Sequence, residues 1–500
     1  MNMKNLIFTC CLLMVLAMPG SLPAQVKDLY LKVDSKFIVH TMKGGIGASW
    51  HALVNDTPLD NDRYDYPVRH VNPRGSAFGG NPPLADTAAW NQLYKHAKWL
   101  DLNFIRVEIS QNMYEPARDT FDWNNEEMLV LYKILDWCEA NHADVFLQQM
   151  WGDVAWNSFP GVHPLLSAPR SLDDFANGIS TLLEYLTNTK KYTCIKYFSM
   201  TNEPPGGTWG YWWSAGSYTG PTITEAWKKL HQTFEARNIK IPISGPDWVS
   251  LPGLDTSKIN FDPFLGAYDI HSYQGIDEEG EMILSDWARW AHDHKKPFFL
   301  TEFGNMNLGW GKDNPEPKSF EAALSNANDI IRGLNSGVDG FNRWSFTNRG
   351  DLDGQWQLVK TYDAAAKKYV SAVEPENAAY YGFGIISRFL HKNATTIHWF
   401  TEFCIQGVKP AAFKNQDGNI VIFLVNQRQA AVNLHLTLPD QDPKQPFQVY
   451  NVTEALVSGN AFRLDPVQSI KGMNKQKNIQ LLPKSITVIT TYNIKHNDLP

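Results

Sequence analysis

The stretch "KYFSMTNEPPG" (residues 196–206) runs from apolar residues directly into an asparagine, a glutamate and two prolines. Further along the chain, "KPFFLTEFGN" (residues 296–305) repeats the pattern, because its aromatic-rich apolar run also ends in a glutamate. Short apolar runs bounded by turn signals are typical of buried strands. We therefore expect Glu203 and Glu302 to lie at the ends of two buried strands.

Further runs of the same kind accompany these two. The predicted strands span residues 44–51, 104–110, 144–151, 195–203, 241–248, 268–274, 297–304 and 340–346. They are continuously apolar more than alternating, which is typical of parallel strands that are covered on both faces. The chain is therefore expected to contain a parallel sheet rather than a set of hairpins in this region.

Amphipathic segments separate most of these strands. Asp86 can cap one helix, and Ser319 can cap another that ends at Gly337. Further helices are expected at residues 124–141, 171–187, 224–236 and 282–293, whereas residues 249–266 have the weakest helical pattern. Strands that alternate with helices predict an α/β fold, a (β/α)₈ TIM barrel over residues 44–350.

The pattern changes after residue 350. "AVNLHLTL" (residues 431–438) alternates apolar and polar residues, and "QDGN" (residues 416–419) is a hairpin signal between two apolar runs. We expect residues 351–500 to form a linker and an accessory antiparallel β-sandwich domain. Residues 25–43 also contain an alternating run, "LYLKVD", and are predicted to supply one or more strands to that sandwich.

The first residues of the chain have the pattern of a secretory signal peptide. Lys4 precedes an apolar run, and small residues and helix breakers follow it, so residues 1–24 are expected to be removed after Ala24. A lipoprotein anchored through Cys10 or Cys11 is the alternative, but the apolar run before them is very short. The protein is therefore expected to be secreted or periplasmic.

Composition and charge exclude several classes of partner. The net charge of -7 gives no basic surface for nucleic acid, and no other stretch is long and apolar enough for a transmembrane segment in the mature chain. The remaining cysteines show no metal-ligand spacing, so no metal is expected. Tryptophan, tyrosine and phenylalanine together make up 13% of the residues, more than a core requires. We expect a monomer.

The active site of such a barrel lies at the carboxyl ends of its strands. Several predicted strands carry a reactive or ring-bearing residue near that end: Arg106, Asn202, Glu203, His271, Tyr273, Glu302 and Trp344. Two carboxylates on one rim, among aromatic rings and hydrogen-bond donors, indicate glycoside hydrolysis, in which one protonates the leaving oxygen and the other attacks the sugar or activates water. The expected partner is a carbohydrate, and no cofactor is needed.

Asn-Glu-Pro after the fourth strand and Thr-Glu-Phe-Gly at the seventh resemble glycoside hydrolase clan A, the retaining 4/7 barrels. The resemblance covers residues 44–346, and the layout is closest to families thirty, thirty-nine and five. It implies that Glu203 is the acid/base and Glu302 the nucleophile. It further implies that Asn202 binds the sugar 2-hydroxyl, that Arg106 and Tyr273 bind Glu302, and that Trp344 forms the floor of the subsite. Clan members often have a histidine near the end of strand three, where this chain offers Gln148, Gln149 and Trp151, and Trp151 is kept as a sugar-binding candidate.

Other interpretations of these residues stay open at this point. Arg106 alone could form a barrel ion pair, and His271 could be a satisfied core histidine instead of a substrate contact. The aromatic loop 209–213 could be a small core or a stacking platform on the leaving-group side, with Trp209, Trp212 and, after Glu302, Trp310 as its candidate rings. A non-catalytic glycan-binding barrel or a transglycosylase are the alternatives to hydrolysis.

Overall fold

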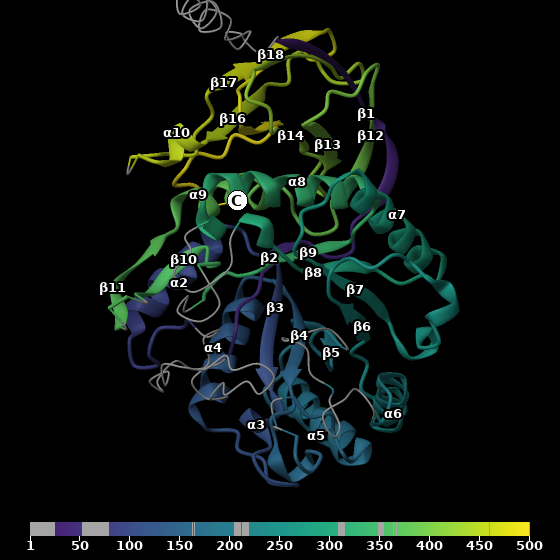
Figure 1. Ribbon diagram of the computed structural model, residues 1–500. Helices are drawn as coiled ribbons and strands as arrows, with labels where there is room; N and C mark the ends of the chain where they lie inside the picture. Colours follow the sequence, from purple (N-terminus) through teal and green to yellow (C-terminus); the bar gives the residue numbers. More distant parts are fainter. Residues whose placement is uncertain are drawn as a thin grey trace, which may run out of the picture.

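A computed structural model describes most of the chain. The described residues are 26–52, 80–162, 164, 166–204, 212, 220–308, 316–348, 355–363, 365–366, 368–459 and 461–499. They form an eight-stranded sheet surrounded by helices and a separate nine-stranded sheet above it in Figure 1. The predicted signal peptide, residues 1–24, lies outside the described residues.

The eight-stranded sheet is the predicted TIM barrel, with the spatial order β2-β9-β8-β7-β6-β5-β4-β3. Its strands are β2 (Ile46–Ala48), β3 (Phe104–Ser110), β4 (Asp144–Trp151), β5 (Ile195–Ser199), β6 (Ile243–Trp248), β7 (Ala267–Ser272), β8 (Phe298–Phe303) and β9 (Gly340–Arg343). Neighbouring strands are parallel throughout. Backbone hydrogen bonds from Trp50 to Arg106 (2.8 Å) and from Ala52 to Glu108 (3.0 Å) join the first strand segment to β3 and close the barrel.

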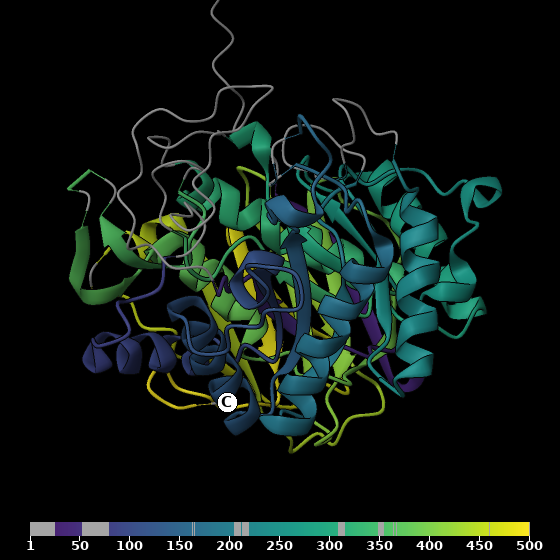
Figure 2. The ribbon, with the colours of Figure 1, turned by 90° about the horizontal axis from the view of Figure 1, so that it is seen from below.

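Helices pack around the outside of the barrel strands (Figure 2). They are α2 (Thr87–Trp99), α3 (Gln111–Tyr114), α4 (Glu126–Ala140), α5 (Leu172–Glu184), α6 (Ile223–Ala236), α7 (Glu278–Asp293) and α8 (Phe320–Ser336). Asp86 and Ser319 accept the capping hydrogen bonds that the sequence predicts, and Gly337 ends α8 with a φ of 90°. Residues 249–266, the weakest prediction, contain only two short 3₁₀ turns, Thr256–Lys258 and Asp262–Phe264.

The barrel interior changes character along its axis. Phe104, Phe146 and Phe299, with Ala267, form a separate buried cluster near the starts of their strands. Two residues further on, the same strands carry Arg106, Gln148, Asp269 and Thr301. Because alternate residues of a strand point to the same face, an aromatic layer supports a polar layer above it. The catalytic rim is therefore built on a packed floor.

The second sheet has the order β17-β16-β19-β14-β13-β12-β1-β15-β18. Its strands are β1 (Lys27–Thr41), β12 (Thr395–Thr401), β13 (Val408–Lys414), β14 (Ile420–Asn426), β15 (Val432–Thr437), β16 (Phe447–Thr453), β17 (Gln468–Ile470), β18 (Lys477–Leu481) and β19 (Ser485–Thr490). The N-terminal strand β1 pairs antiparallel with β12 and parallel with β15. The segment before the barrel thus lies in the accessory sheet.

The chain between the two sheets forms the hairpin β10 (Val359–Asp363) and β11 (Lys368–Pro375) and then α9 (Asn377–Ser387). A short helix, α10 (Glu454–Val457), follows β16. Helices α8 and α9 lie between the barrel and the accessory sheet in Figure 1. Strand β14 is buried on both faces, since Val421 and Phe423 join the large barrel core while Ile422 and Leu424 join the core of the accessory domain.

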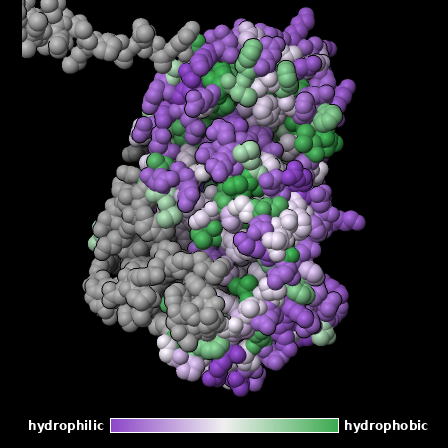
Figure 3. Space-filling view, turned by 45° about the vertical axis from the view of Figure 1, so that its right-hand side comes forward, coloured by the Kyte–Doolittle hydropathy of each residue, from purple (hydrophilic) through white to green (hydrophobic). Residues whose placement is uncertain are grey.

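The outer surface is mainly hydrophilic in the view of Figure 3, with small scattered hydrophobic areas. Within the described ranges, no helix combines the length and apolarity needed to cross a lipid bilayer.

Candidate active site

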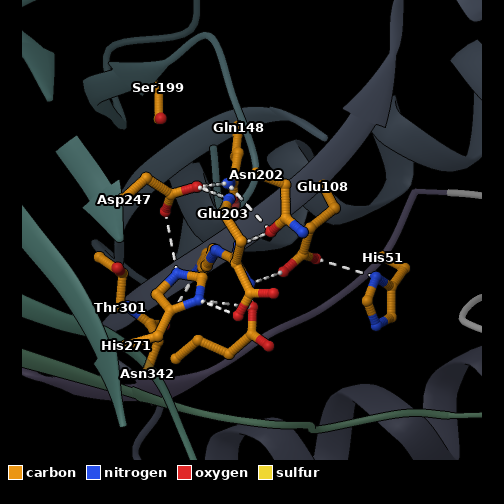
Figure 4. Close-up of polar contacts among 12 residues, drawn as sticks. His51, Glu108, Gln148, Ser199, Asn202, Glu203, Asp247, His271, Thr301 and Asn342 are labelled. Atoms are coloured by element: carbon orange, nitrogen blue, oxygen red, sulfur yellow. Dashed lines mark hydrogen bonds and ion pairs between the residues drawn. The ribbon is translucent and has the colours of Figure 1, made fainter. Parts of the chain in front are cut away.

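Two glutamates meet at the carboxyl end of the barrel strands. Glu203 follows β5, Glu302 lies in β8 and His271 lies in β7. Figure 4 shows the side chains of Glu203 and His271 turned toward each other. One carboxylate oxygen of each glutamate and a ring nitrogen of His271 all lie within 4.8 Å of one another. Both glutamates are nearly buried, with 5% and 6% of their surface exposed. The predicted pair of carboxylates thus shares one site.

Two neighbouring side chains hold the carboxylate of Glu302. Arg106 donates from Nη1 to Oε2, and the Tyr273 hydroxyl donates to Oε1. Arg106 also donates from Nη2 to Asn202 Oδ1 at 2.9 Å. Burial opposes the charge of Arg106, but Glu302 and Glu108 outweigh it and raise the pKa of Arg106 above its usual value. Glu302 therefore has a permanent cation beside it and donors on both oxygens, an arrangement that suits a nucleophile.

The surroundings of Glu203 are different. His271 Nδ1 lies 2.9 Å from Glu203 Oε1, and the backbone N–H of Glu203 donates to Asp247 Oδ2 at 3.0 Å. Burial raises the pKa of Glu203 above its usual range, and the charges of Glu302 and Asp247 act in the same direction, although His271 opposes them. A raised pKa favours the protonated form of the carboxyl group, which is the form that a general acid needs.

Four buried polar residues complete the site and were not among the predicted site residues. They are His51, Glu108, Gln148 and Asp247, all labelled in Figure 4. Glu108 accepts from Arg106 at 3.0 Å and lies 3.1 Å from His51 Nδ1. Burial alone would raise the pKa of Glu108, but His51 and Arg106 outweigh it and lower that pKa.

A signal for two of these residues is present in the sequence. Arg106 and Glu108 alternate in the run 104–110, so they had to share a face of the strand. Asp247 lies near the end of the predicted strand 241–248, where rim residues belong. His51 and Gln148 have no comparable signal, since only the folded barrel brings them beside charged partners.

The structure brings Arg106, Asn202 and Tyr273 to the glutamates, as the sequence predicts. Trp344 directly follows β9, and the guanidinium carbon of Arg106 lies 6.0 Å from its ring centroid. Trp151 is the last residue of β4 and is buried. Contacts of Asn202, Trp344 and Trp151 with sugar stay predictions.

Two predicted substrate contacts are corrected. His271 is fully buried, with Nδ1 facing Glu203 and Nε2 2.9 Å from Asp247 Oδ1, so both ring nitrogens meet carboxylates instead of sugar. Trp212 is buried as well, packs edge to face on Phe175 of α5, and donates from Nε1 to the backbone oxygen of Pro221 at 2.7 Å. For Trp212 the alternative of a small core is therefore the right one.

The other two tryptophans of the predicted platform, Trp209 and Trp310, lie outside the described residues. Their role on the leaving-group side stays a prediction.

Two groups of side chains in the described part of the chain have the composition of metal ligands: Glu203, His271 and Glu302, and, away from the catalytic rim, His40, His292 and Asp339. In the second group the histidine rings stack at 22°, and each Nε2 faces a different oxygen of Asp339, at 3.0 and 2.8 Å. Nearly parallel ring planes direct the nitrogens to separate oxygens and not to one point. In the first group Arg106 and Tyr273 already bind Glu302. Hydrogen bonding accounts for both groups.

Comparison with known proteins agrees with this geometry. A family model described as cellulase (glycosyl hydrolase family 5) matches residues 65–333. No curated protein matches the chain in sequence.

Solved structures resemble the chain over nearly its whole length. A glycoside hydrolase family 30 subfamily 8 xylanase from Clostridium acetobutylicum is 14% identical with a TM-score of 0.60, and the match covers 92% of this chain and 98% of the xylanase. A conserved exported protein from Bacteroides fragilis is 13% identical with a TM-score of 0.63, covering 92% and 100%. An endo-β-1,6-glucanase is 14% identical with a TM-score of 0.60, covering 93% and 94%. At such identities the likeness concerns the fold alone.

Proposed function

The chain belongs to glycosyl hydrolase family 5, because the cellulase family model matches more than half of the chain's residues, and we propose that it is a retaining enzyme that cleaves β-glycosidic bonds of oligo- or polysaccharides. That it is a glycoside hydrolase with a clan A barrel follows from the family and the fold. We further propose the stereochemical course of the reaction, the roles of individual residues and the cellular location in which the enzyme acts.

The proximity of the two carboxylates is the observation that carries the proposal of retention. Oxygens of Glu203 and Glu302 approach within 4.8 Å. Retaining enzymes hold their carboxyl groups about 5–5.5 Å apart, whereas inverting enzymes need about 6.5–9.5 Å to admit a water molecule between carboxylate and sugar. The spacing supports direct attack by one carboxylate on the sugar.

In the proposed first step, a carboxylate oxygen of Glu302 attacks the anomeric carbon while Glu203 gives its proton to the leaving oxygen. The glycosidic bond breaks and a covalent glycosyl-enzyme forms. In the second step Glu203, now a carboxylate, takes a proton from water, and that water attacks the anomeric carbon and releases Glu302. Each turnover returns both glutamates to their starting states, so two inversions give net retention.

The solved structures with similar folds guide the choice of substrates. One is titled a xylanase and another an endo-β-1,6-glucanase, which supports testing β-linked xylans and glucans first. A third is titled an exported protein, which agrees with the expected signal peptide and supports action outside the cytoplasm. We propose that the enzyme works there as a monomer.

A mechanism-based inactivator tests this proposal. Aryl 2-deoxy-2-fluoro-β-glycosides of a sugar that the enzyme hydrolyses should label the wild-type chain once, on the peptide that contains Glu302. Glu302→Gln should not be labelled and should lose roughly 10³-fold or more in kcat, because covalent catalysis needs the carboxylate. Glu321→Gln, which removes an exposed carboxylate on α8, is the control and should label normally.

The anomeric form of the first product completes the test. Proton NMR during the first minutes of hydrolysis should show the β-anomer before mutarotation. A first product with inverted configuration, or a label on another residue, would contradict the proposal.

A further inference from the structure

We propose that Asp247 is a positioning residue of this reaction, which holds the backbone of Glu203 and selects the tautomer of His271, so that Glu203 and His271 share one proton between Oε1 and Nδ1. The inference rests on the proposed function, since it explains how the acid/base is kept ready. The clan resemblance assigns no role to Asp247.

The contacts of Asp247 come from three different strands or their ends. Its Oδ2 accepts the backbone N–H of Glu203 at 3.0 Å and Nε2 of Gln148 at 2.9 Å. Its Oδ1 lies 2.9 Å from His271 Nε2. Asp247 is fully buried, so water does not compete for these donors. Two donors on Oδ2 and a histidine nitrogen beside Oδ1 suit a side chain whose two oxygens only accept hydrogen bonds, which an aspartate provides and an asparagine does not.

The backbone at both residues agrees with a positioning role. Glu203 has a φ of 48° and Asp247 a φ of 58°, both in the left-handed region that residues with a side chain rarely adopt. Such conformations persist where surrounding contacts impose them, and they cluster at functional sites. The hydrogen bond between the Glu203 backbone and the Asp247 side chain links the two. It directs Glu203 toward Glu302 from the end of β5.

The contact with His271 determines which ring nitrogen faces the acid. Because Asp247 Oδ1 lies 2.9 Å from Nε2, its carboxylate favours a hydrogen on that nitrogen, and Nδ1 is left to meet Glu203 Oε1 at 2.9 Å. One proton can then lie on either side of the Nδ1–Oε1 contact. On Oε1 it is ready for the leaving oxygen, and after its transfer the incoming water supplies the next proton to Oε1.

Other charged or titratable groups surround this shared proton: Glu302, Arg106, Tyr273, Glu108 and Asp269. Burial, and next to it the charge of Asp247, raise the pKa of Asp269 well above its usual value. Asp269 also accepts from Ser244 at 2.9 Å. The two N–H groups that donate to Asp247 Oδ2 favour a carboxylate at Asp247. Although burial opposes it, Glu302 and Asp247 raise the pKa of His271 well above its usual value.

The test compares Asp247→Asn with Asp269→Asn. In Asp247→Asn a negative charge beside the shared proton is lost, so the pair should release that proton more readily. The alkaline limb of kcat/KM should move to lower pH, and kcat should fall on the order of 10²-fold on substrates with poor leaving groups, which need the acid. Labelling of Glu302 by an activated fluoroglycoside should persist. Asp269→Asn removes a carboxyl group whose raised pKa favours the neutral form, and it should leave the alkaline limb in place.

A merely structural role for Asp247 predicts something else. Asp247→Asn would then lose activity equally on good and poor leaving groups, with no shift of the alkaline limb, and this result would overturn the proposal.

A measurement on the wild-type enzyme covers the case in which the variant does not fold. Nitrogen-15 NMR of histidine-labelled protein, with His271 assigned through His271→Gln, should show Nε2 carrying a hydrogen across the active pH range. A spectrum with Nε2 unprotonated would overturn the inference. Because this spectrum requires no turnover, it distinguishes failure of the inference from failure of the proposed hydrolysis.

Discussion

At the scale of single residues, one barrel places two chemically identical carboxyl groups in different surroundings. Glu302 has the Arg106 guanidinium and the Tyr273 hydroxyl on its oxygens. Glu203 has a histidine that can give or take a proton, and its burial raises its pKa. Different surroundings for two carboxyl groups are how enzymes separate an acid from a nucleophile at one pH.

Replacing Glu203 by alanine tests its role as the acid/base. Glu203→Ala should slow substrates with poor leaving groups by roughly 10²–10⁴-fold, because their oxygen needs protonation, while activated aryl glycosides still form the intermediate and then stall. Azide should restart turnover and give a β-glycosyl azide, identified by NMR. Because burial raises the pKa of Glu203, we expect the alkaline limb of kcat/KM above the usual carboxyl range in the wild-type enzyme, and this limb should disappear in the variant. An α-azide, or no rescue, would remove Glu203 from this role.

At the scale of elements, the helix cap at the start of α8 links a local sequence signal to the free energy of unfolding. The Ser319 side chain accepts from the backbone N–H of Ala322 at 3.2 Å at the start of α8. Ser319→Ala should lower the free energy of unfolding by about 0.5–2 kcal/mol, because that donor loses its partner. Urea unfolding measures the change, and Ser319→Asp, which restores an acceptor, should recover most of it. Equal loss in both variants would show that the cap bond is not responsible.

Trp212 provides a second prediction at this scale, because its ring joins the aromatic loop to α5. Trp212→Ala should destabilise the protein by about 3–5 kcal/mol, since it removes a packed ring together with a hydrogen bond to Pro221. Any loss of kcat/KM should be equal on aryl monoglycosides and on oligosaccharides, because the ring does not reach sugar. Trp209→Ala is the comparison and is predicted to affect oligosaccharides alone. If Trp212→Ala acted only on long substrates, the correction of its role would be wrong.

At the scale of the whole molecule, the barrel and the accessory sheet share one core. Phe413, Val421, Phe423, Tyr450 and Ile486 of the accessory sheet belong to the same buried cluster as the barrel residues. Polar contacts cross the boundary as well, including Lys409 with Glu281 at 2.7 Å and Asn335 with the backbone oxygen of Pro410 at 2.9 Å. Strand β1 reaches the accessory sheet before the chain enters the barrel. We therefore expect that neither the barrel nor the accessory sheet folds stably without the other.

We predict that the mature chain unfolds in a single calorimetric transition, and that a chain truncated after residue 350 aggregates. The reason is that truncation uncovers the apolar face of α8, which packs on β13, β14 and β19. Lys484→Ala, which removes only an exposed ion pair with Glu321, should shift the transition little. Two separate transitions in the intact chain, or a soluble and active barrel fragment, would contradict the shared core.

Much of this architecture was predictable because strand and helix signals are local. Continuous apolar runs, caps at Asp86 and Ser319 and the glycine after α8 depend on neighbouring residues alone. The same holds for the two glutamates, since each follows directly from an apolar run. Residues 249–266 were the weakest helix prediction for the same reason, because their sequence lacks an apolar period, and the structure has only short turns there.

The barrel, the accessory domain with its N-terminal strand, and the rim positions of Glu203 and Glu302 can be inferred from residue order, because they follow from periodicity and from the order of elements. The partners of the buried side chains, in contrast, become apparent in the folded barrel. His271 faces two carboxylates instead of sugar, Trp212 turns inward onto Phe175, and Asp247 joins Glu203, Gln148 and His271 from another strand. These residues are far apart in the chain and come into contact only when the barrel closes. A local sequence pattern therefore does not show which of them will be neighbours.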